Sequence, residues 1–474
     1  MLFNSLVFLV FLGVVLPVFY LLPQRFKKIF LLLASYVFYG YWDWRFCSLL
    51  LLSTVMDYYL GHAIYTETNE KKRKRLLHLS LLVNLTLLGF FKYFNFFVDS
   101  FAQVFGTQLD SVHLHVILPV GISFYTFQSL SYTFDLYRKK LEPAKSLLDY
   151  SVFVSFFPQL VAGPIEKAVH LLPQVEKIKM PDRQYLKEGV ILITTGMFKK
   201  IIIGDTIGKY VDNVFAEPGN FSSGELICTL IMFAVQIYAD FSGYSLIAKG
   251  CGKLLGVTLM DNFNQPYLAS NITDFWRRWH ISLSDWLKDY VYIWWLGGNR
   301  KGKFRTYLNL MATMLLGGLW HGANWTFVIW GGIHGAALAF HKFILGDKKV
   351  ETRFTYKGPA SLIKFVFNVF FTFLIVLFAW LFFRAADLKT ATTVLSHIFD
   401  WTSSDLIGDF IIVTLLYFSV IIFLDAVEYY TNNHAYLLLL KPAIRYGILI
   451  PVWTIILVFM YTVGKPAPFI YFQF

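Results

Sequence analysis

The sequence predicts an all-α, polytopic integral membrane protein. The chain has 474 residues, of which 57% are hydrophobic and 19% aromatic, while only 15% are charged. Soluble domains carry about 25% charged residues, so this composition indicates that lipid is the main solvent of the chain. At about 20 residues per crossing, the apolar content allows at most roughly 13 spans and leaves no room for a large soluble domain. We therefore expect a single domain over residues 1–474.

Apolar runs predict the helices in chain order. They fall at residues 3–22, 29–41, 46–61, 77–98, 116–134, 147–162, 189–203, 225–250, 306–318, 325–345, 363–383, 407–426 and 445–463. Runs of about 10–14 residues are too short to cross a bilayer, and we expect them to be re-entrant, interfacial or buried in the bundle. We also expect 147–162 to be re-entrant. If this segment crossed the membrane, the basic stretch that follows it would lie outside, against the positive-inside rule.

Basic residues alternate between the loops. They follow the first, third and fifth runs, at Arg25, Lys27 and Lys28, at 71–75, and at Arg138, Lys139, Lys140 and Lys145. The stretch 99–115 contains neither Lys nor Arg. The positive-inside rule then places the N-terminus outside and the basic loops in the cytoplasm. Anionic lipid headgroups account for the net charge of +12, and the sequence carries no nucleic-acid-binding motif.

The segment 272–295 is rich in Trp, Arg and Asp, unlike a lipid-facing helix. Helical spacing predicts one amphipathic helix at the membrane interface, with Thr273 as a possible N-cap and with Trp276, Trp279 and His280 on one apolar face. A structural anchor at the interface is the more favoured alternative for the Trp and Arg residues. His280 is different, because a histidine in an apolar face is costly unless its ring nitrogens have partners.

A second histidine, His321, lies in the run MLLGGLWHGANW, whose glycines permit close helix packing. An ionisable residue at membrane depth predicts a functional site, although a neutral histidine bonded to a carbonyl is an open alternative. His334 is expected to be a packing or supporting residue. Asp240, in QIYADFSGYS, could orient a histidine or bind a cation, and a plain hydrogen bond between helices is an equal alternative.

Two histidines at membrane depth favour acyl transfer. A neutral imidazole can take the proton of an alcohol as it attacks a thioester, while a second polar group stabilises the oxyanion or positions the acceptor. The sequence has no nucleophile elbow, Walker loop or zinc-protease motif, and its three cysteines show no metal-ligand spacing, so no metal is expected. A transporter or channel is the competing class, and a lipid O-acyltransferase is a third alternative.

Longer blocks carry a family resemblance. FWRRWHISLSDWLKDYVY, LGGNRKG and GGLWHGANWTFVIWGGIHG resemble the signature region of the membrane-bound O-acyltransferase family, in its bacterial alginate O-acetyltransferase-like branch. Blocks at 118–138, 155–167, 236–245, 261–267 and 465–474 resemble the same branch in the same order, so the similarity covers essentially the whole chain. The chain departs from the branch at Leu246, where an acidic residue is expected.

The resemblance implies both a fold and an activity. It implies a ring of helices around a thinned centre, with His321 and His280 as active-site residues. It also implies a multi-pass protein of the bacterial inner membrane that moves an acetyl group from a cytoplasmic thioester, such as acetyl-CoA, to a cell-surface or periplasmic polysaccharide. A separate SGNH-type transferase is the expected partner, and no tightly bound cofactor is expected. Alginate, peptidoglycan, cellulose and other exopolysaccharides remain open as acceptors, and the same architecture serves D-alanyl transfer to teichoic acid.

Further residues are expected around this site. Trp276, Trp279, Trp320, Asn324 and Asp240 are expected to shape the substrate tunnel. A basic group at its cytoplasmic mouth could bind the phosphates of coenzyme A or an acidic carrier protein. Its members are Arg300, Lys301, Lys303 and Arg305. Membrane anchoring by the same positive charges is an equal alternative for this group.

Overall fold

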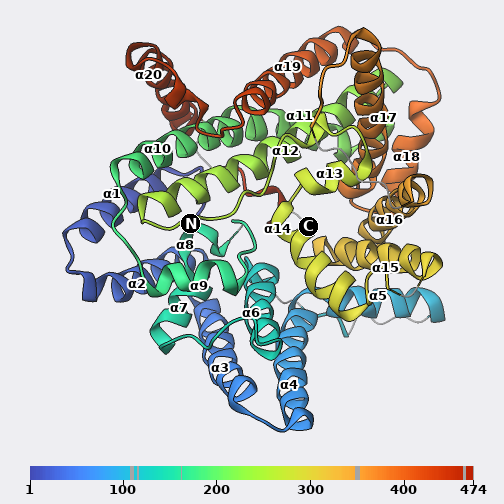
Figure 1. Ribbon diagram of the computed structural model, residues 1–474. Helices are drawn as coiled ribbons and strands as arrows, with labels where there is room; N and C mark the ends of the chain where they lie inside the picture. Colours follow the sequence, from blue (N-terminus) through green and yellow to red (C-terminus); the bar gives the residue numbers. More distant parts are fainter. Residues whose placement is uncertain are drawn as a thin grey trace. The chain divides into compact units, whose positions relative to one another are not determined.

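The computed structural model describes residues 1–106, 112–114, 117–161, 163–300, 302–346, 353–462 and 466–472. Over these residues the regular elements are all helical, with no β-strand (Figure 1). The prediction of an all-α fold is therefore confirmed. Lipid explains this outcome, because a helix satisfies its backbone hydrogen bonds within one segment and needs no water to do so.

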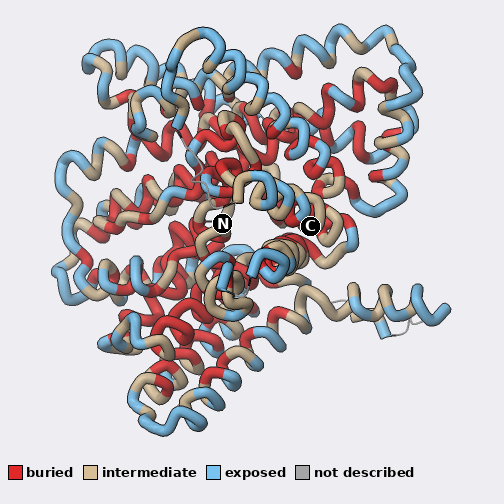
Figure 2. The backbone as a smooth tube through the Cα atoms, turned by 45° about the vertical axis from the view of Figure 1, so that its right-hand side comes forward, coloured by how far each residue is buried: buried red, intermediate tan, exposed pale blue. Residues whose placement is uncertain are grey.

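Seven helical segments among the described residues are long and apolar enough to cross a membrane. They are Gln24–Thr66, Glu70–Phe105, Ser223–Leu254, Trp325–Leu345, Pro359–Arg384, Ile407–Thr431 and Pro442–Thr462. The last of these exposes most of its apolar surface, and only Ile456 and Met460 are buried in it; Figure 2 shows similar exposed stretches along other helices. Apolar side chains exposed over whole helices are expected of a lipid-facing surface. The chain is thus a multi-pass membrane protein.

The described residues divide into two compact units, and each is described by itself. The first comprises residues 1–193 and 244–260. Its helices are α1 (Leu6–Leu21), α2 (Gln24–Asp43), α3 (Cys47–Thr66), α4 (Glu70–Leu88), α5 (Phe94–Phe105), α6 (Ile122–Tyr137), α7 (Leu147–Ser155), α8 (Phe157–Leu160) and α9 (Ala168–Glu176), together with most of α10 (Arg183–Met197) and the end of α12 (Ser223–Leu254). The prediction of one domain over the whole chain is not tested by this division and stays a prediction.

Buried polar contacts join helices within this first unit. Asp57 of α3 accepts hydrogen bonds from Ser80 Oγ at 2.7 Å and Asn84 Nδ2 at 2.8 Å, both on α4. Helix α6 is buried along nearly its whole length. Helix α7 has nine residues, a length of about 14 Å, which is too short for a hydrocarbon core of about 30 Å. Helix α7 alone therefore does not cross the bilayer, and the prediction that 147–162 is re-entrant stays a prediction.

The second unit comprises residues 194–243 and 261–474. Its helices are the end of α10, α11 (Asp205–Ala216), the first part of α12, α13 (Ile272–Arg278), α14 (Ile281–Trp286), α15 (Lys303–His321), α16 (Trp325–Leu345), α17 (Pro359–Arg384), α18 (Leu388–Ile398), α19 (Ile407–Thr431) and α20 (Pro442–Thr462). Helices α15 and α16 pack with their backbones in contact. A Cβ at Gly318 would overlap the carbonyl oxygen of Phe327, and one at Gly331 would overlap that of Met314. Glycine at these positions therefore permits the close packing that places the end of α15.

Candidate active site

The predicted interfacial helix over 272–295 is wrong as a single element. Helix α13 ends at Arg278, Trp279 is extended, and His280 adopts a left-handed conformation with φ 42° before α14 begins. Tertiary hydrogen bonds explain the break, because Asn264 N donates to Arg278 O and Ile281 N donates to Asn262 O, each at 2.9 Å. A left-handed non-glycine residue costs about 1–2 kcal/mol, so the surrounding bonds must hold His280 in place.

The start of α13 also differs from the prediction. Asn271, and not Thr273, caps the helix, since its side chain accepts a hydrogen bond from Asp274 N at 2.8 Å. Thr273 Oγ1 instead lies 2.8 Å from His341 Nδ1, on α16. The cap was mispredicted because both residue types are common at helix N-termini, and only the fold selects between them.

The Asn262 side chain fixes the protonation pattern of His280. Asn262 Oδ1 lies 3.0 Å from His280 Nδ1 and accepts hydrogen bonds from Ser282 Oγ at 2.8 Å and Ser282 N at 3.3 Å. The backbone N–H of Ser282 can only donate, so the atom facing it must be the amide oxygen. His280 Nδ1 therefore carries the hydrogen, and Nε2 holds the lone pair.

His280 is a neutral imidazole in the folded protein. Its side chain is fully buried, and this burial lowers its pKa to about 3. Among the described residues Nε2 has no hydrogen-bond partner. An imidazole lone pair that is buried, neutral and without a protein partner is available to a substrate proton.

His321 is the last residue of α15 and is 3% exposed. Its ring centroid lies 6.3 Å from that of His280 and 4.9 Å from that of Trp330. Trp330 lies 15 residues before the end of α16 at Leu345, which corresponds to about 22 Å along the helix axis. The two histidines therefore lie together, and Trp330, which contacts His321, is about 8 Å along the axis from the N-terminal end of α16 at Trp325.

The C-terminal segment adds a residue that the sequence analysis did not identify. The Tyr471 ring lies 5.2 Å from His321 and 6.4 Å from His280, and its hydroxyl is buried without a partner among the described residues. The neighbouring residue, Ile470, donates its backbone N–H to Asp240 Oδ2 at 2.9 Å. This bond holds Tyr471 against the histidine pair.

Asp240 thus supports the C-terminal segment, and its close partners are not histidines. Its Oδ1 lies 2.7 Å from Lys200 Nζ, which also pairs with Asp205 at 2.7 Å. Burial pushes the pKa of Lys200 down, but the attraction of the two carboxylates outweighs it and leaves that pKa above its usual value. Lys200 is therefore charged and balances Asp240.

The predicted tryptophans take different places. Trp320 packs against both histidines, with ring distances of 5.9 Å to His280 and 5.1 Å to His321. Trp276 donates Nε1–H to His334 Nδ1 at 3.2 Å, and Trp279 packs against other aromatic rings, including Trp380 at 4.9 Å. Trp320 therefore lines the pair directly, whereas Trp276 and Trp279 belong to the aromatic packing around it.

Trp330 and Asn324 also differ from what the sequence suggested. Trp330 was not among the predicted site residues. Its ring centroid lies 4.9 Å from that of His321 and 4.8 Å from that of His334. Asn324 caps α16 by accepting from Thr326 N at 3.1 Å, and it donates to Ala386 O at 2.7 Å. An Asn directly before an apolar run is itself a helix-start signal, so this position could have been recognised as a cap.

The predicted donor-mouth residues on α15, Lys303 and Arg305, lie far along the helix from His321. Arg300, Lys303 and Arg305 are exposed, and Lys301 lies outside the described residues. Lys303 begins α15 and His321 ends it, a separation of about 27 Å along the helix. These cations could contact only the far end of a long donor. The described residues include no group of three or more His, Cys, Asp or Glu side chains arranged to hold a metal ion.

The fold and the site define a multi-pass helical membrane protein with a buried pair of histidines inside one unit. Comparison with known proteins gives the family. The family model described as MBOAT, membrane-bound O-acyltransferase family, matches residues 36–384. The chain belongs to this family and is an acyltransferase, which does not favour the transporter interpretation.

Curated relatives differ in the acceptor that their names give. The chain is 43% identical over 415 residues to the probable alginate O-acetylase of Pseudomonas aeruginosa, covering 86% of this chain and 77% of that protein. It is 39% identical over 415 residues to the peptidoglycan O-acetyltransferase of Helicobacter pylori, covering 81% and 76%. A shorter match, 30% over 233 residues, covers 47% of this chain and 59% of the teichoic acid D-alanyltransferase of Bacillus subtilis.

Proposed function

We propose that the protein moves an acetyl group from a cytoplasmic thioester, acetyl-CoA, across the bacterial inner membrane for O-acetylation of a cell-envelope polysaccharide. The observation that carries this proposal is the pair of buried histidines, His280 and His321, whose ring centroids lie 6.3 Å apart. The chain belongs to a family of acyltransferases. The two relatives of highest coverage cited above support acetyl as the group and a polysaccharide as the acceptor, since both names specify O-acetylation of such a polymer.

The geometry supports general base catalysis by the pair. A hydroxyl oxygen attacks the thioester carbonyl carbon, the C–S bond breaks, and the hydroxyl proton passes to an imidazole and then to the leaving thiolate. His321 is the proposed base or acyl-relay residue, and His280 is its partner, with Nε2 free to exchange a proton. Trp320 excludes water from both rings, which strengthens electrostatic interactions inside the site.

The acceptor reaches the site from the opposite side of the membrane in this proposal. A periplasmic or membrane-anchored transferase of the SGNH type would receive the acetyl group and pass it to the polysaccharide. The differing names of the relatives leave alginate and peptidoglycan as alternative acceptors. Labelled acetyl-CoA supplied to membranes separates this function from lipid acylation, because the label would enter the glycan fraction and not phospholipid.

Substitution of His321 tests the chemistry. His321→Ala should insert normally and lose O-acetylation by about 10²–10⁴, the usual cost of removing a positioned general base. His321→Gln should be nearly as inactive, because an amide restores a hydrogen bond but not basicity. His280→Ala should also be severely impaired, and the double variant should be little worse than the worse single variant.

His341→Ala serves as the matched control, since His341 lies on α16 and contacts Thr273, away from the pair. Release of coenzyme A and glycan acetylation are both measured at equal protein levels in the membrane. Wild-type acetylation by a stably expressed His321→Gln protein would overturn the assignment.

A further inference from the structure

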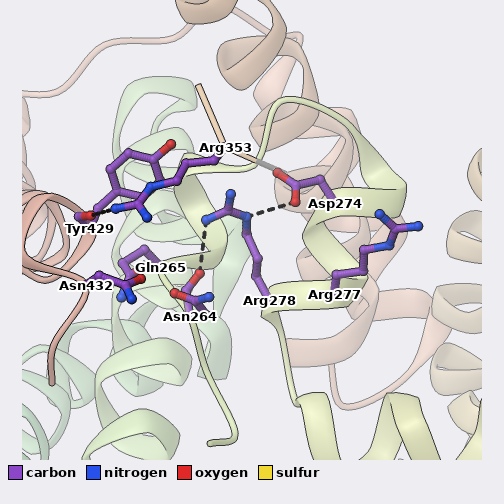
Figure 3. Close-up of a pocket in the computed structure, with 8 residues that line it drawn as sticks. All are labelled: Asn264, Gln265, Asp274, Arg277, Arg278, Arg353, Tyr429 and Asn432. Carbon is purple, nitrogen blue, oxygen red and sulfur yellow. Dashed lines mark hydrogen bonds and ion pairs between the residues drawn. The ribbon is translucent and has the colours of Figure 1, made fainter. Parts of the chain in front are cut away.

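A polar pocket lies in the same unit as the histidine pair. It has a volume of about 310 Å³. Three chain segments, together with Arg353, line it: residues 264–265, α13, and the C-terminal end of α19 (Figure 3). The lining residues are Asn264, Gln265, Asp274, Arg277, Arg278, Arg353, Tyr429 and Asn432.

Positive charge exceeds negative charge in this pocket. Three arginines and a single carboxylate, that of Asp274, are among its lining residues. Arg278 is only 5% exposed; its Nε lies 3.0 Å from Asp274 Oδ1, and its Nη1 donates to Asn264 O at 3.3 Å. Asp274 therefore balances one guanidinium, and the formal charges of the residues that line the pocket sum to a positive value.

Two guanidinium groups share one aromatic ring. Arg278 and Arg353 lie 5.7 Å and 5.5 Å from the centroid of the Tyr429 ring, and Arg353 Nη2 donates to Tyr429 O at 3.0 Å. Figure 3 shows Arg353 along Tyr429 and the guanidinium of Arg277 pointing away from Arg278. Both guanidinium groups line the same pocket, so an anion bound in it would be attracted by both.

Two residues of the pocket have left-handed backbones, Gln265 with φ 44° and Asn432 with φ 52°. Asn432 caps the C-terminal end of α19, where a left-handed asparagine is common. Gln265 is the strained position, of the kind that clusters at ligand sites. The side-chain amide of Asn432 is a neutral hydrogen-bond donor in the pocket lining, whereas Gln265 Nε2 donates to Glu428 Oε2 at 3.3 Å.

The pocket is connected to the histidine pair by two short backbone segments. Asn264 and Arg278 line the pocket. Two residues further along each segment, Asn262 and His280 are joined by a hydrogen bond in the candidate active site. Two residues of extended chain span about 7 Å. One elongated ligand could therefore occupy the pocket with one end and reach His280 with the other.

Charge along the chain places this pocket on the cytoplasmic side. The connection at 346–358 carries Lys348, Lys349, Arg353 and Lys357, whereas the next connection, 385–406, carries Lys389 alone. The positive-inside rule then assigns the first connection, which contains Arg353, to the cytoplasm. A cytoplasmic donor would meet the pocket before the histidines.

We propose that this pocket binds a phosphate group of the acyl-thioester donor, with Arg278 and Arg353 as its ligands. The proposal rests on the proposed function, because a thioester of coenzyme A or of a carrier-bound phosphopantetheine carries phosphate at the end remote from the acyl group. The phosphate ligands in this proposal are therefore residues of the pocket, in place of the basic group around Lys303 that the sequence predicted. An anionic phospholipid headgroup also carries a phosphate group. The test below distinguishes binding of this headgroup from binding of the donor.

The test compares coenzyme A with pantetheine, which lacks phosphate, on the purified full-length protein in phosphatidylcholine nanodiscs. Arg353→Gln should weaken coenzyme A binding about tenfold, as expected from losing one charge-assisted contact, and should leave pantetheine binding unchanged. Arg445→Gln is the matched control, because Arg445 is also exposed and also lies over a tyrosine ring, 5.4 Å from Tyr446. It should bind both probes as the wild-type protein does.

Further outcomes separate the sources of phosphate and the two proposals. If phosphatidylglycerol in the nanodiscs weakens coenzyme A binding to the wild-type protein but not to Arg353→Gln, the pocket binds a lipid headgroup and the donor assignment is wrong. Acetyl-CoA turnover with an unchanged KM in Arg353→Gln also overturns the inference, while the proposed function stands. Arg353-dependent binding of coenzyme A by the purified protein, together with no acetyl transfer to glycan in membranes supplied with labelled acetyl-CoA, would overturn the proposed function and leave the phosphate site.

Discussion

His280 and Asn262, 18 residues apart in the chain, are joined by a hydrogen bond of 3.0 Å between imidazole Nδ1 and the amide oxygen. Because Ser282 N–H fixes the orientation of the amide, this single contact sets the tautomer of His280 and directs its lone pair to Nε2. The positioning of His280 thus depends on a residue outside both histidine motifs.

Asn262→Ala should lower acetyl transfer about 10²-fold, because a small displacement of a catalytic group has an effect of this size. Asn262→Asp keeps the acceptor oxygen and should retain more activity than the alanine variant at equal expression. Its added negative charge should also raise the pKa of His280 and shift the pH–rate profile upward. Equal losses in the two variants, with no shift of the profile, would indicate a purely structural role.

Protonation of His280 should make the folded protein acid-sensitive. Burial lowers its pKa to about 3, whereas the unfolded chain has a histidine pKa of about 6.5. The unfolded state therefore binds the proton first, so the stability contribution is complete above pH 6.5 and is lost as pH falls below that value. The apparent melting temperature of the wild-type protein should fall more than that of His280→Gln between pH 7 and pH 5. Parallel curves for the two proteins would contradict this expectation.

Tyr471→Phe isolates the role of a hydroxyl group at the histidine pair. The ring and its packing are kept, so insertion and thermal stability should change little. We expect glycan acetylation to fall about 10²-fold, the typical effect of losing one polar group that acts on a developing charge. Acetylation and expression are measured in parallel with those of Tyr461→Phe, an exposed tyrosine on α20. Full activity of Tyr471→Phe would leave Tyr471 with a packing role only.

Membrane topology can be read from single cysteines. In a background lacking Cys47, Cys228 and Cys251, Lys72→Cys should label with an impermeant thiol reagent only after permeabilisation, because 71–75 is predicted to be cytoplasmic. Val112→Cys, in the predicted outside stretch 99–115, should label in intact cells. Labelling of Lys72→Cys in intact cells would reverse the orientation.

Apolar runs predicted the long helices of the second unit closely. The runs at 325–345, 363–383 and 407–426 correspond to α16, α17 and α19, which the structure places at Trp325–Leu345, Pro359–Arg384 and Ile407–Thr431. The prediction succeeds because a lipid-exposed backbone can satisfy its hydrogen bonds only within its own helix. Local apolarity then determines the element almost completely.

The interior of the site could not be predicted in this way. Local spacing predicted a continuous helix through His280, but backbone bonds from Asn262 and Asn264 break it there. Lys200 lies in a run that the sequence marks as apolar, and only its pairing with Asp240 and Asp205 explains how a charge is tolerated at that position. Both outcomes depend on partners that no helical period connects.

The sequence by itself determined the helical class and the membrane environment, and its local motifs predicted His280 and His321 as the site residues. Tertiary structure alone decided that His280 and His321 lie 6.3 Å apart, that Asn262 orients the first, and that Tyr471 joins them from the end of the chain. The physical reason is that burial removes water as a hydrogen-bond partner. Each polar group in the site then takes whichever residue the folded chain brings to it.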